Sequence, residues 1–322
     1  MTDASRSVRR RAVLMLFVAT LYWGLSFPVI KSVNSLDRDL MPGAGSWFIA
    51  AMALAPRFVL ATALVLLLDR GSGAPTRSEA TQGAALGAFA AAGAFLQTDG
   101  LQYASASTSS FLTQFSAILI PAWVALRSRR SPGAAIWVGC LLVLVGVAVL
   151  GHLDVRTLRL GRGEWETLLC SLFYTGQILW VERPGFEANR PAPVTFVMFL
   201  VQSAAFCGLA AATSRGVHAA AAPLTSPAWL ALTLILAVVC TLGPFSIMNK
   251  WQPRISATHA GLVYCIEPLS ASLFALFVPS IISAWAAIHY PNEQATWSLV
   301  IGGGLITAAN VLVLIKSEKS SL

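Results

Sequence analysis

Residues 12–31 read AVLMLFVATLYWGLSFPVIK, a run in which only the last residue, Lys31, carries a charge. About 20 apolar residues in a helix match the hydrocarbon thickness of a bilayer, and a helix satisfies its own backbone hydrogen bonds there. Similar runs recur along the chain, so that 56% of its 322 residues are hydrophobic and only 11% are charged. Soluble domains carry about a quarter charged residues. The sequence therefore predicts an all-α, polytopic membrane protein.

Composition argues against several other classes of protein. The net charge of +8 does not indicate nucleic-acid binding, because the basic residues fall in the breaks between apolar runs. The five cysteines lie inside apolar runs without a Cys-x-x-Cys pair, so they are expected to pack as small apolar residues. The basic N-terminus precedes an apolar run without a small-residue cleavage site, which predicts a retained first helix. We expect no metal, no cofactor and no nucleic-acid partner.

The apolar runs predict ten membrane-spanning helices separated by short breaks rich in Arg, Pro and Gly. They are expected over residues 12–31, 46–68, 80–101, 107–126, 133–151, 164–181, 193–212, 228–248, 257–284 and 297–315. Ten crossings place both chain ends on one side of the membrane. Most of the 22 lysines and arginines fall in the breaks on that side. The positive-inside rule therefore predicts that both termini are cytoplasmic.

Two similar segments indicate an internal repeat. Ser105–Thr108 (SAST) opens the fourth predicted helix, and Ser256–His259 (SATH) opens the ninth. A repeat of five helices is odd, so the second copy enters the membrane with opposite orientation, as in many secondary transporters. The sequence predicts two inverted five-helix repeats that enclose a shared cavity. The expected division is a cytoplasmic tail 1–11, a first repeat 12–152, an external linker 153–162, a second repeat 163–316 and a tail 317–322.

Several short motifs follow one another in a fixed order. They are Tyr22–Pro28 (YWGLSFP), Leu96–Ser107 (LQTDGLQYASAS), Ser110–Thr113 (SFLT), Gly163 with the apolar run after it, Ile266–Pro268 (IEP) and Gly302–Ile306 (GGGLI). Together they resemble the EamA-type permeases of the drug/metabolite transporter superfamily. The resemblance implies a ten-helix permease of two EamA domains, often an exporter of amino acids or small metabolites across a bacterial inner membrane.

One segment departs from the pattern of that family. Its members usually have a short Gly-Glu turn between the last two helices, whereas here residues 277–292 come before Glu293. The extra stretch predicts a longer ninth helix or an external cap. A gating role for Glu293 does not carry over directly.

Three charged residues inside the predicted helices stand out as candidates, because a charge at membrane depth usually faces a cavity or a partner. Glu267 directly precedes Pro268, which removes a backbone donor and loosens the turn. Burial disfavours an ionised carboxylate, so Glu267 is a candidate for proton exchange; the alternative is a structural carboxylate paired with a buried arginine. Arg57 is expected either to bind a substrate carboxylate, to snorkel, or to be the locked partner of Glu267. Asp99 is either a gating residue of the vestibule or a polar helix end.

Aromatic and amide side chains predict a substrate pocket, since aromatic faces hold flat or cationic solutes. The alternative is that these aromatic residues anchor at membrane interfaces or pack between helices. The candidates are Trp23, Ser26, Gln97, Gln114, Tyr174, Gln177, Trp180 and Tyr264. His259, which opens the ninth helix, is either a proton relay or a solvated cap.

These features predict a secondary transporter that exports small organic metabolites by alternating access, with Glu267, Arg57 and Asp99 in coupling or gating. Its partners are the solute and the lipid bilayer, and the chain is a monomer or a homodimer. A membrane channel or facilitator is the alternative. A membrane-embedded enzyme is less consistent with the sequence, which contains no HExxH, GxSxG or P-loop motif. We therefore expect no enzymatic activity.

Overall fold

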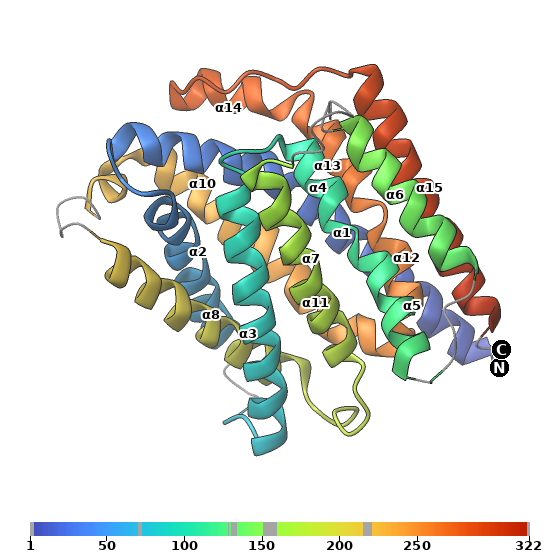
Figure 1. Cartoon of the computed structure of the whole chain (residues 1–322). Coiled ribbons are helices and arrows are strands. Elements are labelled where there is room, and N and C mark those ends of the chain that lie inside the picture. Colours follow the sequence, from blue (N-terminus) through green and yellow to red (C-terminus); the bar gives the residue numbers. More distant parts are fainter. Residues whose placement is uncertain are drawn as a thin grey trace.

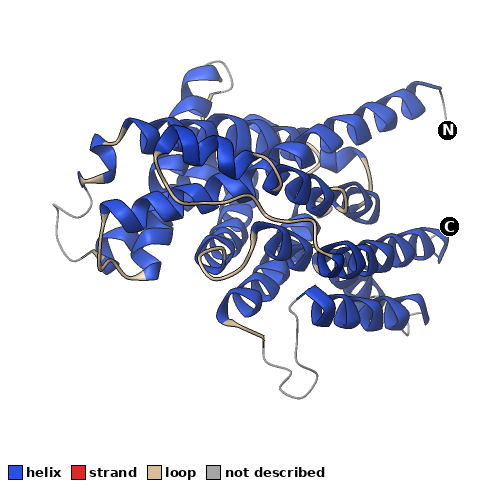
Figure 2. Ribbon diagram, turned by 90° about the horizontal axis from the view of Figure 1, so that it is seen from above, coloured by secondary structure: helices blue, strands red, loops and turns tan. Residues whose placement is uncertain are grey.

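The computed structural model describes residues 3–69, 73–127, 129, 134–150, 160–214 and 221–320. Within these ranges every regular element is a helix, as Figure 2 shows, and the all-α prediction is confirmed. Most of the predicted external linker 153–162 lies outside the described residues.

The helices follow one another without any sheet, and Figure 1 shows their arrangement. The first half of the chain forms α1 (Asp3–Leu40), α2 (Ser46–Leu68), α3 (Arg77–Gly100), α4 (Ala106–Thr113), α5 (Ser116–Arg127) and α6 (Ala134–Leu150). The second half forms α7 (Arg162–Val181), α8 (Pro191–Thr213), α10 (Pro227–Ala237), α11 (Gly243–Trp251), α12 (Ala257–Tyr264), α13 (Glu267–Ala275), α14 (Val278–Ala286) and α15 (Trp297–Ser320). Three short turns complete the second half: the 3-10 turns η1 (Pro223–Thr225) and η3 (Gln252–Arg254), and the π-helical turn η2 (Val238–Leu242) between α10 and α11.

Serine side chains begin α4 and α12, as expected for residues that satisfy the first free amides of a helix. The Ser105 hydroxyl accepts a hydrogen bond from the Thr108 amide at 3.0 Å. The Ser256 hydroxyl accepts one from the His259 amide at 3.3 Å. The two similar segments identified in the sequence therefore have the same local structure.

The fourth and ninth predicted helices are broken, which the sequence did not predict. Both α4 and α12 end after eight residues. Gln114–Phe115 separates α4 from α5, and Cys265–Ile266 separates α12 from α13. Pro268 accounts for the second break, because proline suits the first turn of a helix but disrupts its interior. The ninth prediction is interrupted again before α14, which is bent by 48° relative to α13.

Five helical segments among the described residues are long and apolar enough to cross a membrane. They cover residues 7–40, 46–68, 106–127, 191–213 and 227–254. The bent pair α13 and α14 makes a sixth if it is counted as one span, and 297–309 is a shorter apolar helix. Charged residues at the starts of α3 and α7 lower their mean hydropathy. The protein is a multi-pass membrane protein, and the full number of ten spans stays a prediction.

Helices from the two halves of the chain pack against each other. The helix α1 lies against α11, α12 and α13, α2 lies against α8, α3 lies against α7 and α8, and α6 lies against α15. Glycines permit two of these contacts: a Cβ atom on Gly83 would lie 2.7 Å from the Val194 carbonyl oxygen, and one on Gly24 would lie 2.9 Å from the Ala271 amide. The start of α1 and the end of α15 lie on the same side of the molecule (Figures 1 and 2).

Candidate functional site

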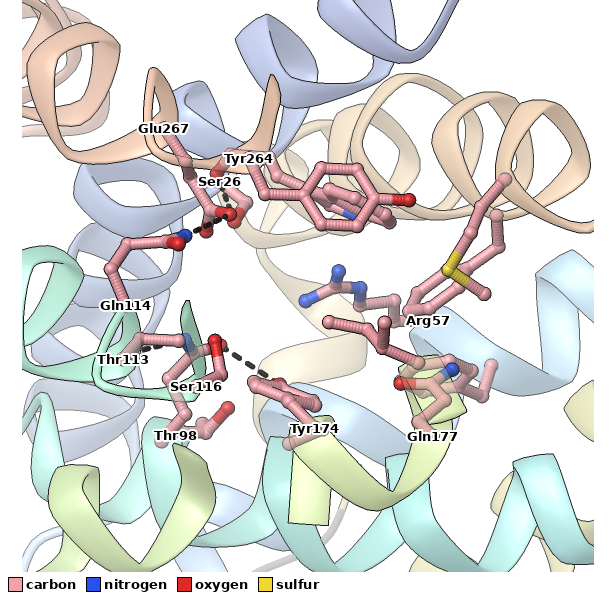
Figure 3. Close-up of a pocket in the computed structure, with 17 residues that line it drawn as sticks. Ser26, Arg57, Thr98, Thr113, Gln114, Ser116, Tyr174, Gln177, Tyr264 and Glu267 are labelled. Carbon is pink, nitrogen blue, oxygen red and sulfur yellow. Dashed lines mark hydrogen bonds between the residues drawn. The ribbon is translucent and has the colours of Figure 1, made fainter. Parts of the chain in front are cut away.

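A cavity lies where helices of both halves meet, and about 730 Å³ among its lining residues, part of it open to the outside, is free of protein atoms. Its lining comes from α1–α5, α7 and α11–α13 and consists of Trp23, Ser26, Arg57, Phe58, Ala94, Gln97, Thr98, Thr113, Gln114, Ser116, Tyr174, Gln177, Ile178, Phe245, Met248, Tyr264 and Glu267 (Figure 3). The breaks after α4 and α12 lie at this cavity, since Gln114 is in the first break and Glu267 follows the second.

All predicted site residues except Trp180 and Asp99 line this cavity. The structure thus brings together side chains that are far apart in the sequence. Their role in binding a solute stays a prediction.

Arg57 is buried, with 5% of its surface exposed, and its guanidinium points into the cavity (Figure 3). Its Nε donates to the Thr241 hydroxyl, and one terminal nitrogen donates to the Cys240 carbonyl at 3.3 Å. Both acceptors belong to the π-helical turn η2. Turns of this kind are often found at functional sites. No ion pair joins Arg57 to Glu267 in the described part of the chain, so the locked-partner alternative does not hold.

Glu267 is the first residue of α13 and is 8% exposed. A helix N-terminus stabilises a negative charge. Its Oε2 accepts a hydrogen bond from the Gln114 amide nitrogen at 3.0 Å. The side-chain oxygen of Gln114, Oε1, is buried and has no hydrogen-bond partner among the described residues. The carboxylate and this amide oxygen thus form a pair of acceptors at the wall of the cavity.

Aromatic rings form one wall of the cavity. Trp23 contacts the edges of Phe245 and Tyr264, with ring centroids 5.4 and 5.5 Å away. The Tyr264 hydroxyl donates to the Gln252 side chain at 2.8 Å, so its ring rather than its hydroxyl is free to meet a solute. The Tyr174 hydroxyl donates to the Gln97 side-chain oxygen at 3.2 Å. These hydrogen bonds fix the orientation of the rings.

Two predicted residues lie elsewhere. Trp180 packs against Phe89 and Phe186 rather than into the cavity. Its three-residue spacing from Tyr174 and Gln177 explains this, because each such step rotates the side chain by about 60° around the helix. Asp99 accepts a hydrogen bond from Arg162 of α7 at the end of α3, where it is completely buried. Asp99 is therefore a bound helix-end residue, outside the cavity lining.

Two carboxylates that were not among the predicted site residues lie at the starts of α4 and α12. Glu293 accepts hydrogen bonds from the amides of Ala106 at 2.7 Å and Ser107 at 3.4 Å. Glu182 accepts one from the Ala257 amide at 2.6 Å. Glu182 carried a weak signal, since it directly follows a predicted helix, and Glu293 stood out only at the end of the extra segment 277–292. Their partners are distant in sequence and gave none.

Cations accompany both carboxylates. Lys31 donates to the carbonyl of Ala104 beside the start of α4. Arg9 and His259 form a hydrogen bond at the start of α12, where His259 also bonds the Ser256 hydroxyl at 2.6 Å. His259 is thus part of the helix start, and a relay role is not required to explain its position.

Comparison with known proteins agrees with this architecture. The sequence model of the EamA-like transporter family matches residues 10–151. No curated protein matches the chain. A solved crystal structure of another protein aligns with 97% of this chain and 99% of its own, with a TM-score of 0.59 and 16% sequence identity. This likeness is evidence for the fold alone.

The family match covers α1 to α6, which contribute Trp23, Arg57 and Gln114 to the cavity. It implies a membrane transporter of the drug/metabolite transporter type. Residues 10–151 therefore belong to the EamA-like transporter family.

Proposed function

We propose that the protein is a secondary transporter that exports amino acids or related small metabolites across a bacterial inner membrane, with both termini in the cytoplasm. The solute binds in the central cavity, which opens alternately to each side. The groups proposed to bind the solute are the two buried charged side chains and the aromatic rings of the cavity.

The observation that carries this proposal is the presence of two opposite charges in the lining of one cavity. Arg57 comes from the first half of the chain and Glu267 from the second, and neither is ion-paired among the described residues. A buried charge is costly unless it is paired or has a function. The guanidinium is suited to a solute carboxylate and the glutamate to a solute ammonium group. A zwitterion satisfies both, and Trp23 and Tyr264 accommodate its apolar side chain.

Alternating access is supported by the equivalence of α4 and α12. Each has eight residues, begins at a capping serine, receives a carboxylate from elsewhere in the chain, and breaks at the cavity. The two helix starts lie near opposite ends of the bundle (Figure 1). This arrangement is what an inverted repeat with one closing device at each end requires.

Reconstitution in liposomes tests the proposed transport directly. Vesicles loaded with one radiolabelled amino acid at a time are expected to show saturable efflux that an excess of external solute accelerates. A conductive, non-saturable flux would instead favour a channel, and a chemically altered solute would favour an enzyme.

Variants of the two charges test how the solute binds. Arg57→Gln is expected to weaken binding of amino acids at least tenfold, because the solute carboxylate loses its partner. Acetylation of the amino group of the solute is expected to weaken binding to the unchanged protein, because the ammonium group that meets Glu267 is lost. Glu267→Gln is expected to abolish proton-coupled movement but to retain part of the solute exchange. Normal transport by Glu267→Gln at every pH would contradict its coupling role.

Trp23→Ala tests the aromatic wall separately. It is expected to weaken solute binding more than it lowers thermal stability, because Trp23 is only partly buried. Unchanged solute affinity in a well-folded Trp23→Ala variant would contradict the position of the solute.

A further inference from the structure

The segment between α13 and Glu293 carries an apolar surface that the cavity does not use. Leu269, Leu273, Phe277, Ile281 and Trp285 follow one another at every fourth position and are 50%, 57%, 59%, 66% and 56% exposed. Side chains four residues apart lie on the same face of a helix. Leu269 and Leu273 therefore share a face of α13, and Ile281 and Trp285 share a face of α14, with Phe277 at the 48° bend between the two helices. These five exposed residues are called here the α13–α14 stripe.

The opposite face of α14 is packed against the bundle. Pro279 and Ile282 are buried, and Ile282 belongs to a cluster with Leu36 of α1 and Trp229 of α10. Figure 1 shows α14 along the upper edge of the molecule, crosswise to α3. The helix thus lies across one end of the bundle, with one face packed and the other exposed.

Hydrogen bonds hold this segment in place. The Asn292 side-chain oxygen accepts from the Ser280 amide at 2.8 Å, and the Ser283 hydroxyl donates to the Tyr290 carbonyl at 2.7 Å. The Glu293 amide donates to the Ala275 carbonyl at 2.9 Å and so returns the chain to the end of α13. The stripe is therefore a fixed surface.

Composition shows which environment suits the surface. Residues 277–292 contain no Asp, Glu, Lys or Arg. A segment that faced water would expose these apolar side chains at a cost and without the charges that usually accompany them. Leu269 and Leu273 continue the same surface along α13, which lies in the bundle.

Other exposed aromatic residues mark the same end of the molecule. They lie where helices begin or end there: Trp47 at the start of α2, Tyr103 after α3, Trp165 in the first turn of α7 and Trp297 at the start of α15. Tryptophan and tyrosine concentrate at the membrane–water interface, because their rings are apolar and their N–H or O–H groups are polar. Trp285 of α14 adds to this group.

We propose that α14 is an interfacial helix, whose part of the α13–α14 stripe (Phe277, Ile281 and Trp285) binds the acyl chains and glycerol region of membrane lipids at the end of the bundle opposite the chain termini. Amphipathic helices lie in this layer with their apolar side among the lipid chains. The absence of charge on the segment means that binding does not depend on the lipid headgroup charge. The proposal requires a membrane location and is independent of the transported solute.

The test compares two labelled positions on α14 in the full chain in liposomes. A fluorescent probe is attached to Ile281→Cys in the stripe or to Ser280→Cys on the side away from the bundle, both with exposed Cys207 replaced by serine. The label on Ile281→Cys is expected to be quenched about threefold more by nitroxide lipids than the label on Ser280→Cys, in zwitterionic and anionic vesicles alike. A water-soluble quencher is expected to give the reverse order.

The remaining outcomes would overturn the proposal. If the aqueous quencher acts more strongly on Ile281→Cys, the stripe faces water. If nitroxide quenching of Ile281→Cys appears only when the protein is diluted in excess lipid, a second copy of the chain covers the stripe. Far-ultraviolet circular dichroism and thermal unfolding of both labelled variants show whether each keeps its fold.

Discussion

The starts of α4 and α12 have similar local sequences but different surroundings. At α4, Glu293 is partly buried and accepts from two amides, with Lys31 bonded to the neighbouring Ala104 carbonyl. At α12, Glu182 is exposed over much of its side chain and accepts from one amide, with Arg9 and His259 nearby. In both cases the local sequence supplies the capping serine, whereas the carboxylate and cation that stabilise the helix start come from distant segments of the chain.

The comparison teaches that two equivalent ends of a transporter need not open equally easily. A carboxylate that accepts two amides in a partly buried position is held more firmly than one that accepts a single amide near solvent. We therefore expect the α12 end to open more readily than the α4 end.

Charge reversal at the two carboxylate caps should have the largest effect on stability. Glu293→Lys removes the carboxylate and places a cation at a helix N-terminus, and is expected to lower the free energy of unfolding by about 3 kcal/mol. Glu182→Lys is expected to cost about half as much, because one amide loses its acceptor instead of two. Thermal unfolding in detergent measures both, with the exposed Glu187→Lys as the matched control. Equal losses for the two caps would contradict the difference described here.

Neutral variants should separate opening of the two ends. Glu293→Gln is expected to raise labelling of a cavity cysteine, Ser116→Cys, from the α4 side, and Glu182→Gln from the α12 side. A loss of about 1 kcal/mol in one closed end changes its population roughly fivefold. Labelling with a membrane-impermeant thiol reagent on oriented vesicles measures this. If both variants increase labelling from the same side, the carboxylates do not close opposite ends.

Variants of the two capping serines test whether the helix starts are equivalent. Ser105→Ala and Ser256→Ala each remove one side-chain acceptor from an otherwise similar helix start, so each is expected to cost about 1 kcal/mol. For a chain of this size the unfolding temperature should fall by about 2–4 °C. Clearly different shifts for the two variants would show that the helix starts are not equivalent.

Acidification should change stability least. The sign of the change should differ between two carboxylates outside the membrane spans, Glu182 and Glu79. Partial burial raises the pKa of Glu182 above its ordinary 4.5, so its folded form binds protons more readily than its unfolded form. Stability from this group is present at low pH and is lost as the pH rises through the raised pKa. The Arg190 guanidinium lowers the pKa of Glu79, whose contribution is present above about 4.5 and is lost as the pH falls.

Stability measured between pH 4 and 7 checks this prediction. Glu182→Gln should remove a gain on acidification of at most a few tenths of a kcal/mol, since solvent screens an exposed group. Glu79→Gln should instead remove a loss of stability on acidification. A change of the same sign in both variants would contradict the assignment.

Apolar runs and short motifs were enough to predict the helices and most of the cavity. The residues Trp23, Arg57, Gln114 and Glu267 stand out because polar or bulky groups are rare within such runs. Trp180 was placed wrongly because a three-residue spacing drifts around a helix. The breaks at Gln114 and Ile266 were missed because hydropathy does not register a short change of backbone direction inside an apolar run.

The carboxylate caps show a different limit. Glu293 reaches α4 only because residues 277–292 leave α13 and return to it, a path that no local pattern specifies. Hydrogen bonding at these positions depends on neighbours 75 and 187 residues away along the chain, which are known only from the folded chain.

The packing of α1 has a consequence for how the molecule moves. At Gly24 the backbone of α1 lies against α13, so a side chain larger than hydrogen would collide with Ser270 and Ala271 of α13. Separating residues 12–152 from 163–316 as two rigid bodies would also break the contacts of α2 with α8, α3 with α7 and α6 with α15. In the proposed transport cycle we therefore expect each moving body to contain helices from both halves of the chain.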